Sequence, residues 1–194
     1  MPYRILRFIA LFICKILFRV KVNGLENIPP KGNMIIAANH SSYLDPIAVA
    51  VVVPRRIKWV VRKDVFDVWW LKPLFTSTGM IRENGSVGKT LDLLGRGEAI
   101  GVFPEGVRSP DGKLGAGKRG VAVMALKSGA PVIPCAIRGA FKAYPRDAVL
   151  PRPYPVEIIL GKAIEPGKSD EPDEAAIDSA LTGIMSAIGS LMEH

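Results

Sequence analysis

The sequence predicts an α/β fold with a single domain. The chain has 194 residues, of which 48% are hydrophobic, so it can bury one core and is too short for a second sizeable domain. After Gly24, short apolar runs alternate with longer stretches of helical periodicity. This alternation is typical of sheets whose strands are connected by helices.

The predicted strands are the short apolar runs. In chain order they cover 34–38, 57–61, 80–82, 100–103, 132–137 and 156–160. The continuously apolar MIIAA of the first run is typical of a strand that is buried on both faces.

The predicted helices cover 44–52, 65–71, 87–94, 120–127 and 173–192. The last one starts near Asp170 with Pro172 in its first turn, where proline is tolerated. The segment 145–155 carries four prolines and is predicted to cross the surface before the last strand.

The first 22 residues predict a basic amphipathic helix rather than a membrane span. Their longest unbroken apolar run, 8–14, has seven residues, whereas a helix needs about 20 to cross a bilayer. Bases follow this run and no small-residue cleavage site appears, which disfavours a signal peptide. Wound at about 100° per residue, the segment gathers its bases in one sector: Arg4, Arg7, Lys15 and Arg19.

Two interpretations of this helix remain open. It packs on the domain like an ordinary surface helix, or it lies in the plane of an anionic membrane surface with its bases at the headgroups. We favour the membrane because the apolar face is large and no acidic residue precedes Glu26. In that orientation three aromatic side chains are near the acyl chains: Phe8, Phe12 and Phe18.

The chain is basic, with 26 Lys and Arg against 18 Asp and Glu and a net charge of +8. The first 164 residues hold 25 of these bases and 11 of the acids, a balance of +14. Such a surface attracts nucleic-acid phosphate, an anionic membrane or a phosphorylated substrate, and composition does not choose among them. Cys14 and Cys135 stand apart, without a CxxC or nearby histidines, which predicts a reducing compartment and neither a disulfide framework nor a structural zinc site.

The first cluster of reactive side chains is NHSSYLD at 39–45, where a predicted strand passes into a helix. Such strand ends are where α/β folds place their sites. His40 can take a proton from a substrate hydroxyl if Asp45 turns back to fix its tautomer and stabilise the imidazolium. Helix capping is the alternative for this spacing, and it is the role expected of Ser41 and Ser42 because no G-x-S-x-G surrounds them.

A second cluster, GVFPEGVRS at 101–109, also follows a predicted strand. The planar guanidinium of Arg108 suits a phosphate, and Glu105 could hold that arginine or a ligand hydroxyl. Arg82 ends a third strand. We expect the three strand ends to converge, although a solvated surface charge is the alternative for each arginine taken alone.

Four ordered motifs resemble those of the lysophosphatidic acid acyltransferase (PlsC-like) family of glycerolipid acyltransferases. NHSSYLD is similar to its N-H-x-x-x-x-D, GMIR at 79–82 to its second block, FPEGVRS at 103–109 to F-P-E-G-T-R-S, and VIPCAI at 132–137 to V-I-P-V. The resemblance covers 39–139. It implies an acyltransferase domain over 23–194 with a central, mixed, mostly parallel sheet flanked by helices, preceded by the amphipathic helix over 1–22.

The resemblance implies acyl transfer with His40 as general base and Asp45 as the residue that orients it. The free hydroxyl of a lysophospholipid loses its proton to His40 and attacks the thioester of acyl-CoA or acyl-carrier protein, with no acyl-enzyme, metal or bound cofactor. Lys63 would stabilise the oxyanion of the tetrahedral intermediate. The residues implied to bind the phosphate and glycerol of the acceptor are Arg82, Glu105, Gly106 and Arg108.

A further basic group lies between Asp45 and Asp64. Together with the two arginines of the motifs, we expect it to face a phosphorylated acceptor and an acidic donor carrier. Its members are Arg55, Arg56, Lys58, Arg62 and Lys63.

The implied reaction converts 1-acylglycerol 3-phosphate to phosphatidate, and the implied protein is peripheral (monotopic) on the cytoplasmic face of the cell membrane. Val107 stands where the family has threonine, so glycerol 3-phosphate or a lyso-aminolipid stays open as the acceptor. A non-catalytic module that binds anionic lipid stays open as a different class. Nucleic acid is not an expected partner, because the bases are not interleaved with aromatics or set on a recognisable reading helix.

Overall fold

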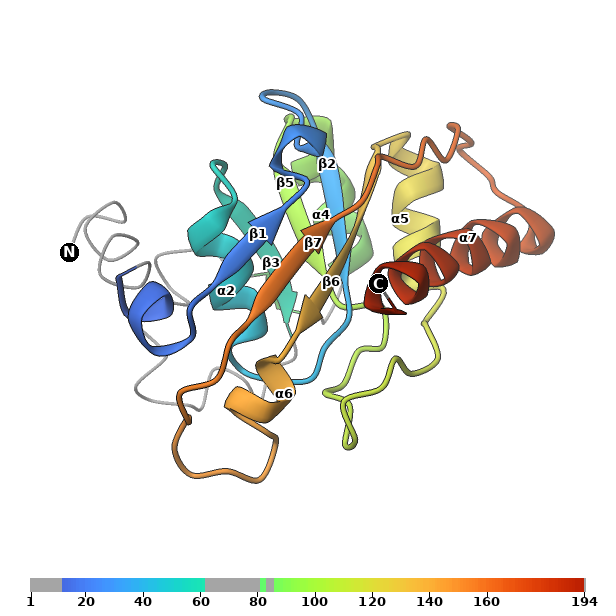
Figure 1. Cartoon of the computed structure of the whole chain (residues 1–194). Coiled ribbons are helices and arrows are strands. Elements are labelled where there is room, and N and C mark those ends of the chain that lie inside the picture. The colour runs from blue at the N-terminus through green and yellow to red at the C-terminus, as the bar shows by residue number, and fades with distance from the viewer. Residues whose placement is uncertain (1–11, 62–80, 83–85, 194) are drawn as a thin grey trace.

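The structure, a computed structural model, describes residues 12–61, 81–82 and 86–193. Within these residues it contains one seven-stranded sheet with helices on both faces (Figure 1). The predicted helix over 65–71 and Lys63 lie outside the described residues.

The elements follow the predicted order along the chain. They are β1 (Lys21–Asn23), a 3-10 helix (Leu25–Asn27), β2 (Met34–Ala38), α2 (Asp45–Val52), β3 (Ile57–Val61), β4 (Ile81–Arg82), α4 (Ser86–Gly95), β5 (Ala99–Val102), α5 (Gly120–Ser128), β6 (Val132–Arg138), α6 (Ala140–Ala143), β7 (Glu157–Leu160) and α7 (Glu174–Glu193). Within the described residues, each strand and helix predicted after Gly24 is present to within one or two residues at its ends, and 145–155 contains neither helix nor strand.

The strand order is β1-β7-β6-β2-β5-β3-β4. β2 is parallel to β5 and β6, and β3 is parallel to β5 and β4. β7 runs antiparallel to β6 and pairs in parallel with β1. The prediction of a mixed, mostly parallel α/β sheet is confirmed, and the chain crosses from one side of β2 to the other between β5 and β6, which makes β2 the position where such sheets bind ligands.

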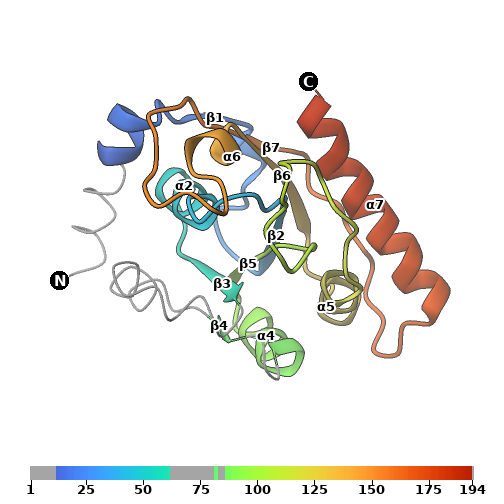
Figure 2. The same ribbon diagram turned by 90° about the horizontal axis from the view of Figure 1, so that it is seen from below.

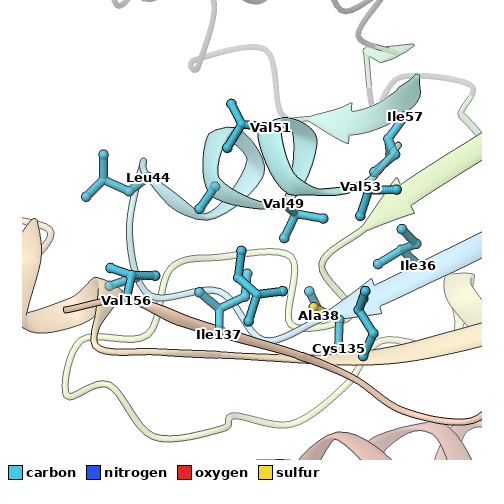
Figure 3. Packing of buried hydrophobic residues seen from close by; sticks show 14 of the residues in the cluster. Ile36, Ala38, Leu44, Val49, Val51, Val53, Ile57, Cys135, Ile137 and Val156 are labelled. Atoms are coloured by element: carbon cyan, nitrogen blue, oxygen red, sulfur yellow. The ribbon is translucent and has the colours of Figure 1, made fainter. Parts of the chain in front are cut away.

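Alternate side chains of β2 enter two separate cores. Met34, Ile36 and Ala38 pack under α2, as Figure 3 shows for two of them, whereas Ile35 and Ala37 pack under α5 and α7. Figure 2 shows α2 on one face of the sheet and α5 and α7 on the other. All of β2 is buried, as expected of a central parallel strand, so the backbone that leads into the motif at 39–45 is held firmly on both faces.

The N-terminal helix ends earlier than predicted. Within the described residues it covers 12–17, and Lys21–Asn23 forms an edge strand of the sheet, so the domain begins before the predicted boundary at residue 23. Cys14 and Phe18 are buried in the core under α2. The expectation that Phe18 faces acyl chains is therefore wrong, because this side chain holds the segment on the domain.

The described part of the chain contains one helix, α7, that is long and apolar enough to cross a membrane. In the structure α7 lies along β6 and α5, with Ile184 and Ile188 buried. Its apolar stripe therefore covers one face of the sheet.

Candidate active site

His40 and Asp45 form a hydrogen-bonded pair beyond the carboxyl end of β2. β2 ends at Ala38, and Asp45 is the first residue of α2. The turn between them brings the carboxylate back to the ring, and His40 Nδ1 lies 2.8 Å from Asp45 Oδ2. The structure thus brings together the two residues that the sequence pairs.

Asp45 is fully buried, and its Oδ2 accepts three hydrogen bonds. Besides the His40 ring, the backbone N–H groups of Ser41 and Ser42 each donate to it over 2.7 Å. Because a carboxylate in this arrangement only accepts, the ring hydrogen lies on Nδ1, which leaves a lone pair on His40 Nε2. The site therefore presents an imidazole in the tautomer that a general base requires.

Two further side chains fix this turn. Asn39 extends the pairing of β2 with β6, since its Nδ2 donates to Ile137 O over 3.0 Å and its Oδ1 accepts from Ile137 N–H over 2.7 Å. Ser42 Oγ donates to Tyr144 O over 2.8 Å and accepts from Leu44 N–H over 3.1 Å. Neither bond caps α2, whose N-cap residue is Leu44 without a side-chain hydrogen bond, so the capping expectation for Ser41 and Ser42 is wrong. Sequence reasoning gives Asn39 no role, although its place before His40 in the motif could have drawn attention to it.

An aromatic stack fixes the plane of the His40 ring. The ring lies 3.9 Å from that of Phe103 with 14° between their planes, and Phe103 in turn lies 4.6 Å from Trp59. Gly101 makes room for the stack, because a Cβ there would come within 2.5 Å of the Trp59 ring. The His40 side chain keeps 16% of its surface exposed, so one face is packed and the ring remains reachable.

Arg108 lies over the same turn. Its Cζ is 3.6 Å from the centre of the Tyr43 ring, a cation–π contact that holds the guanidinium flat. Among the described residues, its Nη1 is buried without a hydrogen-bond partner. A buried donor without a partner is costly, and an anionic ligand beside His40 would satisfy it.

The carboxylate of Glu105 is bonded to the backbone. Oε1 accepts from His40 N–H over 2.8 Å, and Oε2 accepts from Gly115 N–H over 2.9 Å. Burial raises the pKa of Glu105, and these two hydrogen bonds oppose the rise. Glu105 is expected from the sequence to contact Arg108 or a ligand. Its two hydrogen bonds instead go to the backbone, and one of them positions His40.

Gly106 lies at the tip of the same turn with φ +69°, a conformation that favours glycine. A Cβ at this position would come within 2.6 Å of Lys118 Nζ, so the ammonium lies on the turn. Lys118 also donates its backbone N–H to Pro104 O over 2.8 Å. Sequence reasoning misses Lys118, and the GAGK run at 115–118 is the signal that could have found it, since glycines allow a loop to approach a backbone closely.

Arg82 ends β4 on the same edge of the sheet as His40. Because β5 and β3 lie between β2 and β4, about 14 Å separates the two strands at the usual spacing. The strand ends therefore share an edge as expected. Lys63, the expected oxyanion stabiliser, lies outside the described residues.

Two members of the basic group between 45 and 64 lie away from His40, and Arg62, like Lys63, lies outside the described residues. Arg55 donates to the carbonyls of Pro29 and Gly32, and Lys58 pairs with Glu98 over 2.8 Å. These residues precede or begin β3, at the amino end of a parallel strand. The expectation that they face the substrates is wrong for Arg55 and Lys58, which bind the protein itself at the opposite edge.

The cysteines take no part in the site. Cys14 and Cys135 are free and buried, and burial raises the pKa of the Cys14 thiol to about 11 and that of Cys135 above its usual range. Neither is poised as a nucleophilic thiolate. In the described ranges, no three His, Cys, Asp or Glu side chains gather into a group that could hold a metal ion.

Comparison with known proteins gives three related findings. The model of the Acyltransferase family matches residues 19–138, more than half of the chain. A 1-acyl-sn-glycerol-3-phosphate acyltransferase of Bacillus subtilis (strain 168) is 34% identical over 128 residues, which cover 62% of this chain and 63% of that protein. A chloroplastic 1-acyl-sn-glycerol-3-phosphate acyltransferase of Arabidopsis thaliana is 27% identical over 164 residues, covering 79% of this chain and 46% of that protein. The chain thus spans less than two thirds of the length of either relative.

The fold also has a counterpart among solved structures. The crystal structure of the 1-acyl-sn-glycerophosphate (LPA) acyltransferase PlsC from Thermotoga maritima matches with a TM-score of 0.80 and 23% identity, covering 97% of this chain and 79% of that one. At this identity the likeness shows a shared fold.

Proposed function

The chain belongs to the acyltransferase family, and from this premise we propose that it transfers an acyl chain from a thioester to the free hydroxyl of a lysophospholipid. The names of the two curated relatives support 1-acylglycerol 3-phosphate as the acceptor and phosphatidate as the product. The observation that carries the proposal is the His40–Asp45 pair beside the unbonded guanidinium nitrogen of Arg108.

In this mechanism the His40–Asp45 pair acts as a general base. Nε2 of His40 takes the proton of the acceptor hydroxyl, and the hydroxyl oxygen attacks the thioester carbonyl carbon. The tetrahedral intermediate collapses with cleavage of the C–S bond, and the thiolate of the coenzyme A or carrier-protein arm takes the proton from His40. Asp45 keeps its hydrogen bond to Nδ1 and stabilises the imidazolium. These bond changes involve no bound cofactor or metal.

The acceptor phosphate binds at the turn that follows β5. Arg108 offers its unbonded nitrogen, and Lys118 adds a second cation over Gly106. Glu105 acts as a positioning residue through the backbone of His40, and Arg82, at the end of β4, supplies a further positive charge. Val107, which is 46% exposed at this turn, keeps glycerol 3-phosphate and a lyso-aminolipid as alternatives that an assay decides.

The helical segment 12–17 attaches the protein to the cytoplasmic face of an anionic membrane. Cys14 and Phe18 pack the segment against the domain, and the other large apolar side chains of the segment are exposed on the side away from the domain. The exposed side chains are Phe12, Ile13, Ile16 and Leu17. An apolar surface of this kind beside Lys15 and Arg19 fits an interfacial helix.

The test measures acyl transfer by the purified full chain. The acceptors are 1-acylglycerol 3-phosphate, glycerol 3-phosphate and a lyso-aminolipid, and the donors are acyl-CoA and acyl-carrier protein. We expect 1-acylglycerol 3-phosphate to be acylated, and His40→Ala to lose about 10²- to 10⁴-fold in turnover while it keeps its circular dichroism and its binding to anionic vesicles. The matched control, His194→Ala, replaces the other histidine of the chain and should retain activity. Asp45→Asn should also lose turnover, because it removes the carboxylate charge that stabilises the imidazolium.

Unchanged transfer by folded His40→Ala contradicts this mechanism. Vesicle binding without transfer by the wild-type protein favours the second candidate, a non-catalytic module for anionic lipid, which the basic body of the chain supports.

A further inference from the structure

A cavity of about 560 Å³ opens next to the proposed active site, on the β6 side of β2. Its walls come from the start of β1, the end of β6, α6 and the loop that precedes β7. Ser41, the neighbour of His40, also lines it. The loop that follows β5 reaches the cavity as well, because Asp111 and Gly112 line it. Arg108 stands earlier in this loop, lies over Tyr43, and does not line the cavity.

The cavity is lined by more bases than acids. The four bases are Arg19, Lys21, Arg138 and Lys142. Lys142 Nζ lies 5.4 Å from the centre of the Tyr154 ring, and the Arg138 Nε is buried without a hydrogen-bond partner among the described residues. A buried unbonded guanidinium nitrogen in the wall of a basic cavity favours an anionic occupant.

The two acids of the cavity are already bonded. Glu157 accepts from Asn23 Nδ2 over 3.0 Å and lies 3.5 Å from Arg138. Asp111 accepts from the Ser109 hydroxyl over 2.9 Å and from a backbone N–H over 3.0 Å. Their charges are thus partly neutralised, and the cavity retains a positive surplus.

The distance from His40 distinguishes between the two substrates. In 1-acylglycerol 3-phosphate the reacting hydroxyl and the phosphate are on neighbouring carbons, so the acceptor phosphate must lie close to His40, where Arg108 is. In a pantetheine thioester, about twelve bonds separate sulfur from phosphate, equal to about four backbone residues or roughly 14 Å when extended. β1, which begins at Lys21, is three strands away from β2, and at the usual strand spacing this is also about 14 Å.

We propose that this cavity binds the phosphate end of the pantetheine arm of the acyl donor, whether the arm belongs to coenzyme A or to a carrier protein. The proposal rests on the proposed function and adds the location of the donor. Arg19, Lys21 and Lys142 contact the phosphate, Arg138 forms the floor, and the arm runs past Ser41 to place the thioester at His40. Acceptor and donor then bind different basic side chains, Arg108 for the acceptor and the bases of the cavity for the donor.

The first experiment measures binding without turnover. Calorimetric titration uses coenzyme A, 4′-phosphopantetheine and pantetheine, which lacks the phosphate. The test variant is Lys21→Gln/Lys142→Gln, whose two side chains are exposed. The matched control is Lys127→Gln/Lys168→Gln, which removes two exposed lysines from a separate cavity of about 290 Å³.

We expect both phosphate-bearing probes to bind the wild-type protein and the control, and pantetheine to bind at least tenfold more weakly. The test variant should lose about tenfold in affinity for the phosphate-bearing probes, because two cations that contact the phosphate are removed. Equal affinity of the test variant and the control overturns the proposal. Displacement of coenzyme A by glycerol 3-phosphate at similar concentration overturns it as well, because the cavity would then be a site for lipid headgroups.

The second experiment separates the substrates kinetically. In the test variant, KM for acyl-CoA should rise about tenfold, while KM for the acceptor and the rate with an acyl-N-acetylcysteamine donor, which has no phosphate, stay at the wild-type values. A rise in KM for the acceptor alone overturns the proposal. Absence of acyl transfer by the wild-type protein would contradict the proposed function, and the titrations would still decide whether the cavity binds phosphopantetheine.

Discussion

The carboxylate of Glu105 joins two loops at the carboxyl edge of the sheet. One oxygen holds the backbone N–H of His40 and the other that of Gly115. A glutamine side chain at this position has one acceptor oxygen, so it can replace only one of the two acceptors. Its NH₂ group would face the other backbone N–H, which is also a donor. The position of His40 therefore depends on a charged side chain that need not touch a substrate.

Glu105→Gln tests this positioning role. We expect kcat to fall while KM for the acceptor changes little, because the base moves and the phosphate-binding side chains remain. The pH dependence of stability gives a second readout. Burial raises the folded pKa of Glu105 above 4.5, so its contribution to stability is present below pH 4.5 and is lost as the pH rises through the folded value. The wild-type advantage in Tm over Glu105→Gln should therefore shrink from pH 4 upward.

Asp111→Asn is the control, because its effect on stability should depend on pH in the opposite direction. Hydrogen bonds from Lys113 N–H and the Ser109 hydroxyl lower the pKa of Asp111 below 3.8, so its contribution is present above that pH and is lost as the pH falls. The wild-type advantage over Asp111→Asn should grow with pH over the acid range. If the wild-type advantage in Tm over Glu105→Gln also grew with pH, burial would not be the dominant influence on the pKa of Glu105.

At the scale of single elements, β5 supports the base through close packing. Gly101 lets the fully buried Trp59 lie against the strand, and Trp59 carries Phe103, on which the His40 ring stacks. A methyl group at 101 would have to displace the whole stack, because backbone and indole are both fixed in the core. Strand packing and ring orientation are thus coupled.

Gly101→Ala should destabilise the fold by about 1–3 kcal/mol, the usual cost of overpacking a core, and should lower kcat. The measurement is urea unfolding together with turnover. Gly88→Ala in α4 is the matched control, because nothing lies within 4 Å of a Cβ there and alanine in a helix gains about 0.5–1 kcal/mol over glycine. An unchanged urea midpoint for Gly101→Ala would contradict this expectation, because the aromatic stack would then shift without a loss in the free energy of unfolding.

At the scale of the whole molecule, the sequence predicts the elements with strong patterns and misses those without one. MIIAA and the segment of α7 are long or apolar enough to be found. β1 has three residues, two of them polar and exposed, and α6 has four, so neither has a period to detect. The His40–Asp45 pairing follows from local spacing, whereas Lys118 and the cavity beside Ser41 depend on segments that the tertiary fold brings together.

The pairing of β1 with β7 makes the N-terminal segment part of the domain. Phe18 O accepts from Val156 N–H over 2.8 Å, Lys21 N–H donates to Val156 O over 3.0 Å, and Cys14 and Phe18 are buried. Deleting residues 1–23 should therefore cost at least ~3 kcal/mol from the loss of the Phe18 side chain. It should also leave β7 as an unpaired edge that promotes association.

Phe12→Ser/Ile16→Ser separates this structural role from membrane binding, because both side chains are more than half exposed. This variant should keep the wild-type Tm and remain monodisperse, yet be released from anionic vesicles, with the residual binding weakened by salt. The matched control, Val149→Ser/Leu150→Ser, removes two exposed apolar side chains from the loop before β7 and should stay bound. If both variants were released equally, the segment 12–17 would not be the specific anchor. If the truncated chain kept its Tm and lost only vesicle binding, the segment would be a separable anchor, and the sheet would not need β1 to close its edge.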